Sequence, residues 1–147
     1  MEKVKVYFEL CHPQAQIPRY AHPGDAGMDV FAVEDVQIAP GETVIVRTGW
    51  KVAIPEGYEL QIRPRSGLSW KTLLRIANSP GTIDAGYREE VGIILHNLSL
   101  EKEYRIKQGE RIAQLVLQAL PQVECLQVAD VGEIGSDRGG GFGSTGD

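Results

Sequence analysis

The sequence lacks the features of a membrane or secreted protein. It holds no apolar run of about 18 residues, and its opening stretch MEKVKVYFELCHP has no apolar segment of the signal-peptide kind. It has only two cysteines, Cys11 and Cys125, with no CxxC pair and no histidine at the spacing of zinc ligands. We therefore expect no membrane insertion, no secretion and no structural zinc, and free thiols in a reducing cytoplasm.

A surplus of positive charge is also missing, because 15 Lys and Arg against 20 Asp and Glu give a net charge of −5. Broad nucleic-acid binding normally needs a basic face, so we expect no nucleic-acid partner. Binding of a small anion stays open, because one short stretch holds four arginines: Arg63, Arg65, Arg75 and Arg88.

No segment keeps a 3.6-residue apolar period long enough for a major helix, although residues 66–72 can form one helical turn. Short apolar runs separated by Gly, Pro and Asp are instead typical of an all-β sandwich or barrel. The length of 147 residues with 42% hydrophobic residues suits a single domain. The predicted strands are 4–10, 28–33, 42–50, 58–63, 73–77, 90–96, 103–106, 111–120 and 123–128.

Two of these runs, VGIILH and IAQLVLQAL, are apolar on both faces, whereas an exposed antiparallel sheet alternates. A second sheet can cover one face, and a neighbouring subunit is a candidate for the other. After Val128 the apolar pattern ends. We therefore divide the chain into a β-domain, residues 1–130, and a mobile C-terminal arm, residues 131–147.

Polar residues at strand ends are the places to look for chemistry, because buried polar groups must be satisfied or used. In AGMDV, Asp29 taken alone is a turn-capping residue. In RPRSGLS, Arg65 suits bidentate phosphate contacts, the Ser66 hydroxyl can donate to a phosphate oxygen, and Gly67 frees its amide for the same anion. A surface turn is an equal alternative for this stretch.

The stretch NSPGTIDAGYREE, residues 78–90, predicts a turn between two strands whose exposed backbone groups can pair with a base edge. Asp84 taken alone is a turn residue. In RIAQLVL, Gln114 shares a face with Ile112 and Val116, so it is either a buried amide that needs a partner or a solvent-facing side chain.

The chain closes on RGGGFGSTGD, in which five of ten residues are glycine. No Lys and no helix follow, so this is not a Walker loop. Phe142 can stack on a base, and Ser144, Thr145 and the glycine amides can bind phosphate. The alternative is a solvated, disordered terminus.

In this order and at these separations, the five stretches resemble the five motifs of the homotrimeric dUTPases, the deoxyuridine triphosphate nucleotidohydrolases. The family patterns AGxDL, PRSGLA, GxIDxGYRGE, GxRIAQL and RGxxGFGSTG correspond to AGMDV, PRSGLS, GTIDAGYREE, GERIAQL and RGGGFGSTG. The likeness spans residues 26–146. One departure is Glu89, where the family usually has Gly; a positive φ there would strain the turn by about 1 kcal/mol.

The resemblance implies a distorted jelly-roll-like β-sandwich or barrel with a flexible Gly-rich arm. It also implies Mg²⁺-assisted hydrolysis of dUTP to dUMP and pyrophosphate by water attack on the α-phosphorus, which removes dUTP and supplies dUMP for thymidylate synthesis. The implied assembly is a homotrimer in which each site draws on three subunits.

The resemblance also assigns roles. Asp84 is the base that orients and deprotonates the water, Ser66 and Gln114 act where charge develops, and Asp29 accepts from a Mg²⁺-bound water in the outer shell. The implied substrate-binding residues are Arg65, Gly67, Asn78, Gly81, Tyr87, Arg138, Phe142, Gly143, Ser144 and Thr145. Among these, Asn78 and Gly81 read uracil, and Tyr87 packs under the sugar and excludes a 2′-hydroxyl.

Two alternatives remain. The dCTP deaminases share the fold but carry a catalytic Glu on the strand after this hairpin, whereas VGIILHN has no carboxylate after Glu90. A catalytically idle nucleotide-binding or regulatory module is the other alternative, and an intact Asp84 and an intact tail argue against it.

Overall fold

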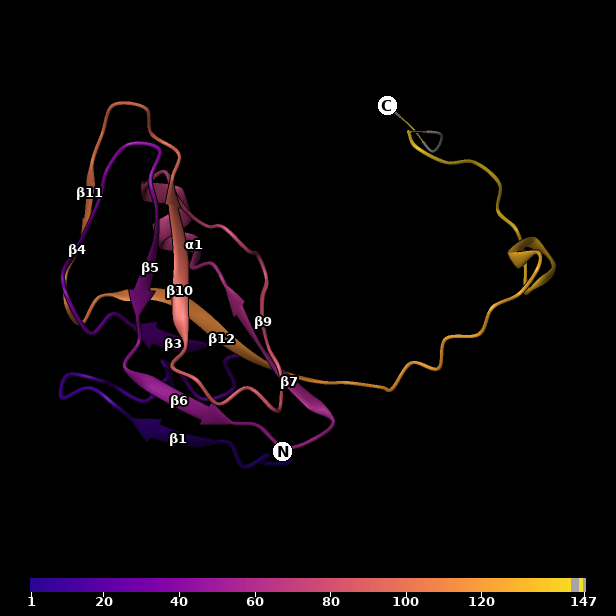
Figure 1. The fold of residues 1–147 in the computed structure, drawn as a ribbon, viewed down its shortest axis with the longest axis horizontal. Coiled ribbons are helices and arrows are strands. Elements are labelled where there is room, and N and C mark those ends of the chain that lie inside the picture. The colour runs from indigo at the N-terminus through magenta and orange to yellow at the C-terminus, as the bar shows by residue number, and fades with distance from the viewer. Residues whose placement is uncertain (144–145, 147) are drawn as a thin grey trace.

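Short strands account for nearly all the regular structure of the chain, whose computed structural model describes residues 1–143 and 146 (Figure 1). The elements, in chain order, are β1 (Tyr7–Leu10), β2 (Arg19–Tyr20), β3 (Met28–Phe31), β4 (Val36–Ile38), β5 (Thr43–Arg47), β6 (Trp50–Ala53), β7 (Tyr58–Arg63), α1 (Ser66–Lys71), β8 (Leu74–Ile76), β9 (Gly81–Ile83), β10 (Gly92–Asn97), β11 (Tyr104–Ile106), β12 (Arg111–Ala119) and the 3₁₀ turn η1 (Val131–Glu133).

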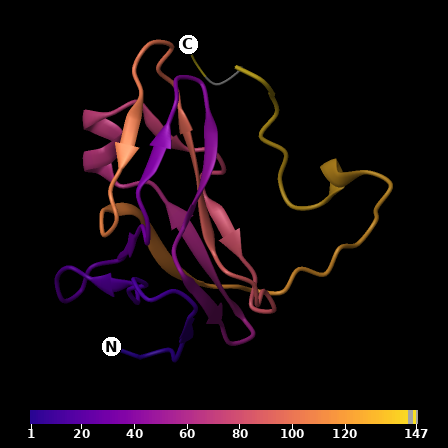
Figure 2. The same cartoon turned by 60° about the vertical axis from the view of Figure 1, so that its left-hand side comes forward.

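The strands form antiparallel sheets that wrap around one core (Figure 2). A five-stranded sheet has the order β2-β3-β12-β7-β9, and a three-stranded sheet has the order β5-β10-β8. Two further pairs, β1-β6 and β11-β4, complete the body. The predicted all-β class and the single helical turn after Arg65 are both confirmed.

The core lies between the five-stranded and three-stranded sheets. Leu60 of β7 and Leu115 of β12 are fully buried, as are Ile93 and Leu95 of β10. Strand β12 buries both of its faces within the single chain, so it needs no neighbouring subunit for cover. Strand β10 alternates between buried and half-buried residues and leaves one apolar face partly open.

The strands differ from the prediction in several places, and β2 and β4 have no predicted counterpart. The predicted strand 42–50 is split into β5 and β6 at Gly49, whose φ of +75° turns the backbone. The turn SPGT leads into a short strand, β9. Residues 123–128 form no strand, and Val123 and Leu126 are 80% and 75% exposed. A strand needs a hydrogen-bonding neighbour, and none within the described residues lies beside this stretch.

The C-terminal arm leaves the body after Leu120, whose N–H donates to the Gly57 carbonyl at 2.7 Å. All described residues beyond that point are exposed, and Figure 1 shows this segment running away from the sheets. The boundary at residue 130 stays a prediction. Among the described residues, no helix is long and apolar enough to cross a membrane.

Candidate active site

The centre of the first group of predicted site residues is β12, which lies between β3 and β7. Its Gln114 is paired with Asp29 on one side and with Arg63 on the other. Asp29 is only 6% exposed. Its Oδ1 lies 3.5 Å from Arg65 Nε, and its Oδ2 lies 3.5 Å from Arg111 Nη1. A buried carboxylate is therefore flanked by two guanidinium groups, which balance its charge.

Arg65 immediately precedes α1, and Ser66 and Gly67 form the first turn of that helix. The first amides of a helix have no partners within it, so they point outward as donors. Arg65 Nη1 donates to the Arg111 carbonyl at 3.3 Å, while the buried Nε makes no hydrogen bond among the described residues. The adjoining cleft has a volume of about 530 Å³, and its charged lining consists of three cations, Arg65, Lys71 and Arg111, and one carboxylate, Glu110. This cleft suits an anion.

The side chain of Gln114 is half-buried and makes no hydrogen bond within the described part of the chain. Gly27 lies directly against it, because a Cβ at Gly27 would stand 3.1 Å from Gln114 Oε1. The glycine of AGMDV thus leaves room for an amide group that is free to bind a ligand.

The second group lies on the hairpin around β9. Gly81 is buried, and a Cβ there would stand 3.2 Å from Ile62 Cβ and 3.3 Å from Asn78 Nδ2, so Asn78 and Gly81 are neighbours. Asp84 is exposed, and its carbonyl accepts from the Tyr87 N–H at 3.1 Å, which closes a tight turn. Asp84 also lines a second cleft of about 540 Å³, together with Tyr58, Leu120 and others.

Within one chain Asp84 lies apart from the first group, although Gly81 of the same hairpin pairs with Ile62, next to Arg63. Strand β7 pairs Leu60 with Ile83 and Arg63 with Gln114. Leu60 and Arg63 are three residues apart, about 10 Å along an extended strand, and Asp84 lies beyond Ile83 on the side away from Arg63. The two clefts share no lining residue. The predicted base therefore lies far from the predicted phosphate-binding residues of its own chain.

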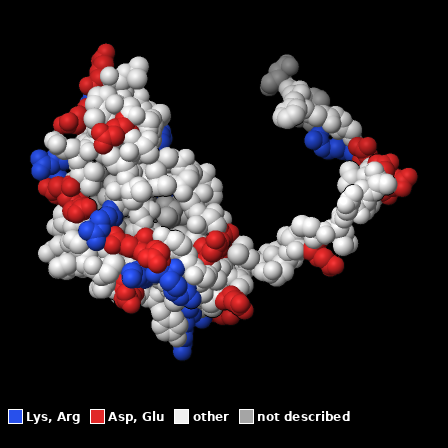
Figure 3. Space-filling model, viewed as in Figure 1, with Lys and Arg blue, Asp and Glu red and all other residues white. Residues whose placement is uncertain are grey.

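The third group lies on the arm. Arg138, Phe142 and Gly143 are exposed, and the arm carries them away from both clefts (Figure 1). Figure 3 shows the arm with several acidic side chains and one basic one, which the sequence identifies as Arg138. The predicted residues Ser144 and Thr145 lie outside the described residues.

Glu89 does not strain its turn. No described residue other than glycine has a positive φ. The position that the family usually fills with Gly therefore adopts an ordinary backbone conformation here, and the strain considered for Glu89 does not arise.

Sequence reasoning missed two residues beside the site. Arg111, the second partner of Asp29, stands three positions before Gln114, and only the pairing of β12 with β3 shows the contact. Glu90 accepts two hydrogen bonds from Arg47, which lower the pKa of its carboxyl below the ordinary value although burial opposes the shift. Forty-three positions separate the two residues, and no local pattern links them.

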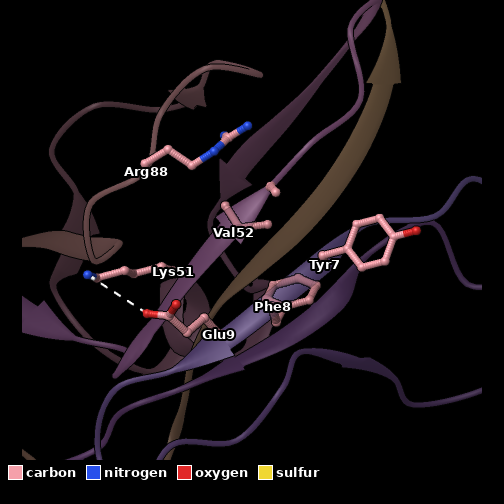
Figure 4. Close-up of a pocket in the computed structure, with 7 residues that line it drawn as sticks. Tyr7, Phe8, Glu9, Lys51, Val52 and Arg88 are labelled. Carbon is pink, nitrogen blue, oxygen red and sulfur yellow. Dashed lines mark ion pairs between the residues drawn. The ribbon is translucent and has the colours of Figure 1, made fainter.

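A further hollow of about 310 Å³ lies beside β1 and β6 (Figure 4). Tyr7, Phe8 and Val52 line it, the Lys51 ammonium lies 3.9 Å from Glu9, and Arg88 extends over its rim. None of the predicted site residues lines this hollow.

Comparison with known proteins identifies one family. A sequence model of the dUTPases matches residues 13–146. The deoxyuridine 5'-triphosphate nucleotidohydrolase of Clostridium tetani is 46% identical over 147 residues and 99% of each chain, and that of a Picosynechococcus species is 50% identical over 136 residues, which cover 92% of this chain and 94% of that one.

Solved structures agree with this assignment. A Staphylococcus bacteriophage 80alpha dUTPase with bound dUpNHpp has a TM-score of 0.88 and 35% identity, covering 97% of this chain and 99% of that one. A mutant dUTPase from phage phi11 of S. aureus, described with a structural Mg(II) ion, has a TM-score of 0.81 and 31% identity over 87% of this chain and 99% of that one.

Proposed function

The chain belongs to the dUTPase family and hydrolyses dUTP to dUMP and pyrophosphate, and we propose that it does so in sites assembled from three copies of the chain. The observation that carries this proposal is the separation of the site residues into three groups within one chain. One copy supplies the Arg65 cluster, which consists of Arg65, Ser66, Gly67 and Gln114. A second copy supplies the Asp84 hairpin, residues 78–90, and a third supplies the arm.

The open face of the three-stranded sheet supports the trimer. Ile45 of β5 is 67% exposed and stands opposite the half-buried Ile94 of β10. A Cβ at Gly92 would come into hard contact with Ile45 Cγ2, so this isoleucine already lies across the neighbouring strand. Burial of this apolar face against another copy would stabilise the assembly.

The Arg65 cluster binds the triphosphate. The Ser66 hydroxyl and the Gly67 amide present donors next to the cleft that Arg65 lines, while Arg65 Nε lies 3.5 Å from Asp29 Oδ1. The unpartnered amide of Gln114 donates to an oxygen where negative charge develops during bond cleavage. Fixed donors of this kind stabilise the transition state without having to reorganise.

The hairpin of a second copy supplies the base and the nucleoside contacts. Asp84 accepts the proton of the attacking water, and the turn closed by the Tyr87 N–H fixes the backbone that carries its carboxylate. The Tyr87 ring packs under the deoxyribose and leaves no room for a 2′-hydroxyl. The adjacent Asn78 and Gly81 read the uracil edge.

We include Mg²⁺ as a cofactor that the substrate brings with it. The described residues contain no group of three or more His, Cys, Asp or Glu that could hold a metal ion, so the donor set fits a cation held mainly by triphosphate oxygens and water. The ion would neutralise phosphate charge. Asp29 keeps unused lone pairs beside its two arginines and can accept from one water of that ion.

The arm of a third copy closes over the bound nucleotide. Phe142 covers the uracil, Arg138 approaches the phosphates, and Gly143, Ser144 and Thr145 surround the γ-phosphate. Ordering costs about 1–2 kcal/mol of backbone entropy per residue, so closure requires the nucleotide contacts that offset it.

We place the protein in the cytoplasm, where the free Cys11 and Cys125 stay reduced.

The shared site is tested by mixing two inactive variants. Asp84→Asn and Gln114→Ala chains are unfolded together, refolded as mixed oligomers and assayed with dUTP and Mg²⁺. A site that takes Gln114 from one copy and Asp84 from another is intact in about one quarter of random combinations, so about a quarter of wild-type activity returns. Activity no greater than that of the separate variants would refute the shared site.

A product assay with each deoxynucleoside triphosphate accompanies this test. Formation of dUMP and pyrophosphate from dUTP alone is expected. Conversion of dCTP to dUTP would instead indicate a deaminase, and nucleotide binding without any product would indicate a regulatory module.

A further inference from the structure

The loop between β9 and β10 carries both Asp84 and Tyr87, and it is tied to the body at its far end by Glu90. The Glu90 carboxylate receives two parallel bonds from Arg47 of β5, with Nε 3.0 Å from Oε2 and Nη2 2.9 Å from Oε1. The Gly49 N–H is a third donor, 3.4 Å from Oε2. The paired side chains are 43% exposed at Arg47 and 25% exposed at Glu90.

The same residue also holds the tyrosine. The Tyr87 hydroxyl donates to the backbone carbonyl of Glu90 at 3.2 Å. Glu90 therefore connects the Tyr87 ring, through its own backbone and side chain, to a strand of the three-stranded sheet.

Arg88 does not make this connection. Its Nη1 donates to the carbonyls of Ala85 and Tyr87, at 2.6 and 3.0 Å, so it braces the turn internally. The rest of its side chain extends over Val52 at the hollow beside β6 (Figure 4).

We propose that Arg47 and Glu90 are positioning residues that fix the Tyr87 ring and thereby set the discrimination between deoxyribose and ribose nucleotides. The inference rests on the proposed contact of Tyr87 with the sugar. A ring can exclude a 2′-hydroxyl only if it resists displacement, because a shift of a fraction of an ångström gives the extra oxygen room. The bidentate ion pair between Glu90 and Arg47 of β5 provides that resistance, since it restrains both the orientation and the distance of Glu90 relative to the strand.

The test compares kcat and KM for dUTP and UTP in Arg47→Gln, Glu90→Gln and the double variant. We expect the ratio of kcat/KM for dUTP to that for UTP to fall about three- to tenfold in each single variant. The change should arise mainly from a higher KM for dUTP and a lower KM for UTP, with kcat for dUTP nearly constant, because Asp84 lies at the other end of the loop. The double variant should lose no more than either single one, since both act through one pair.

Two variants serve as controls. Asp35→Asn breaks the Arg105–Asp35 pair, whose closest distance is 3.0 Å and which does not contact the hairpin, and should leave the ratio unchanged. Tyr87→Phe keeps the ring and removes only its bond to Glu90, so it should reproduce the loss in Glu90→Gln. The variants should fold, because the Val91 N–H still donates to the Trp50 carbonyl at 3.0 Å; thermal melts check this.

The outcomes separate this inference from the proposed function. If Tyr87→Ala lowers the dUTP/UTP ratio but Glu90→Gln and Arg47→Gln do not, the positioning role is wrong and the sugar contact stands. If Tyr87→Ala leaves the ratio unchanged, the proposed sugar contact is wrong and the inference is lost with it. Additive losses in the Arg47 and Glu90 double variant would also overturn the inference.

Discussion

Gly27→Ala should slow catalysis through Gln114 without unfolding the protein. The new Cβ would stand 3.1 Å from Gln114 Oε1 and 3.2 Å from its Cβ and Cδ, closer than ordinary contact. Side-chain torsions can move Oε1 and Cδ away from the new methyl group. The Cβ of Gln114 is fixed by a backbone that is paired on both sides, so that contact is relieved only by a small backbone shift. Returning the amide to its working position then costs about 0.5–1.5 kcal/mol of off-rotamer strain.

This strain corresponds to a fall in kcat of about two- to tenfold, because 1.4 kcal/mol is a factor of ten. Gly27 has no positive φ, so alanine should adopt its backbone conformation and the thermal midpoint should change little. Steady-state kinetics with saturating dUTP and thermal melts measure the two effects.

A double-mutant cycle with Gln114→Ala tests the reasoning. Gln114→Ala removes Oε1 and Cδ and leaves only the Cβ contact, so Gly27→Ala should have a much smaller further effect on kcat in that background. A full, additive loss in the Gln114→Ala background would refute the claim that Gly27 acts through the amide.

Three further predictions concern the base, the arm and the acid stability. Asp84→Asn should lower kcat by at least about 10²-fold, because an amide cannot accept the proton of the water. Binding of a non-hydrolysable dUTP analogue, measured by calorimetry, should stay nearly constant. Normal turnover would remove Asp84 from the base role. Deletion of residues 138–147 should lower kcat/KM for dUTP by orders of magnitude. The oligomeric state and the thermal midpoint should stay nearly unchanged, since the described residues of this segment are exposed. Dissociation on sedimentation would make the arm a structural strap instead. In the folded state the hydrogen bonds from Arg47 lower the pKa of the Glu90 carboxyl. The pair therefore stabilises the fold fully at pH values above the unfolded pKa of about 4.3. This stabilisation is lost as the pH falls through the lower pKa of the folded state. The gap in thermal midpoint between wild type and Glu90→Gln should therefore be constant above pH ~5 and shrink below pH ~4; a gap that widens on acidification would contradict this sign.

Local sequence patterns predict well those features that depend on a few consecutive residues. The helical turn after Arg65 and the strand that contains Gln114 follow from residue type and from a short apolar run, and both are present. The motif residues were recognisable because their resemblance to the dUTPases fixes both order and spacing.

Features that depend on distant partners could not be predicted in the same way. The apolar residues of 123–128 favour burial, but they do not say which surface buries them, and within one chain the stretch stays exposed. The contact of Arg111 with Asp29 follows from strand order, and so does the separation of Asp84 from Arg65. Strand order is a global property that no short window contains.

The central place of β12 has a consequence for hydrogen exchange. Gln114 and Leu115 are paired with β3 on one side and with β7 on the other, and the strand is buried on both faces. Amides in such a position exchange with solvent only when the whole domain unfolds, whereas exposed turns and tails exchange through local opening. Of the proposed phosphate-binding residues, Gln114 thus stands on the slowest-exchanging part of the fold, whereas Ser66 and Gly67 lie in the exposed first turn of α1 and the arm exchanges fastest. Bound nucleotide should therefore slow exchange chiefly in the glycine-rich tail and the Asp84 hairpin, leaving β12 as protected as it already is.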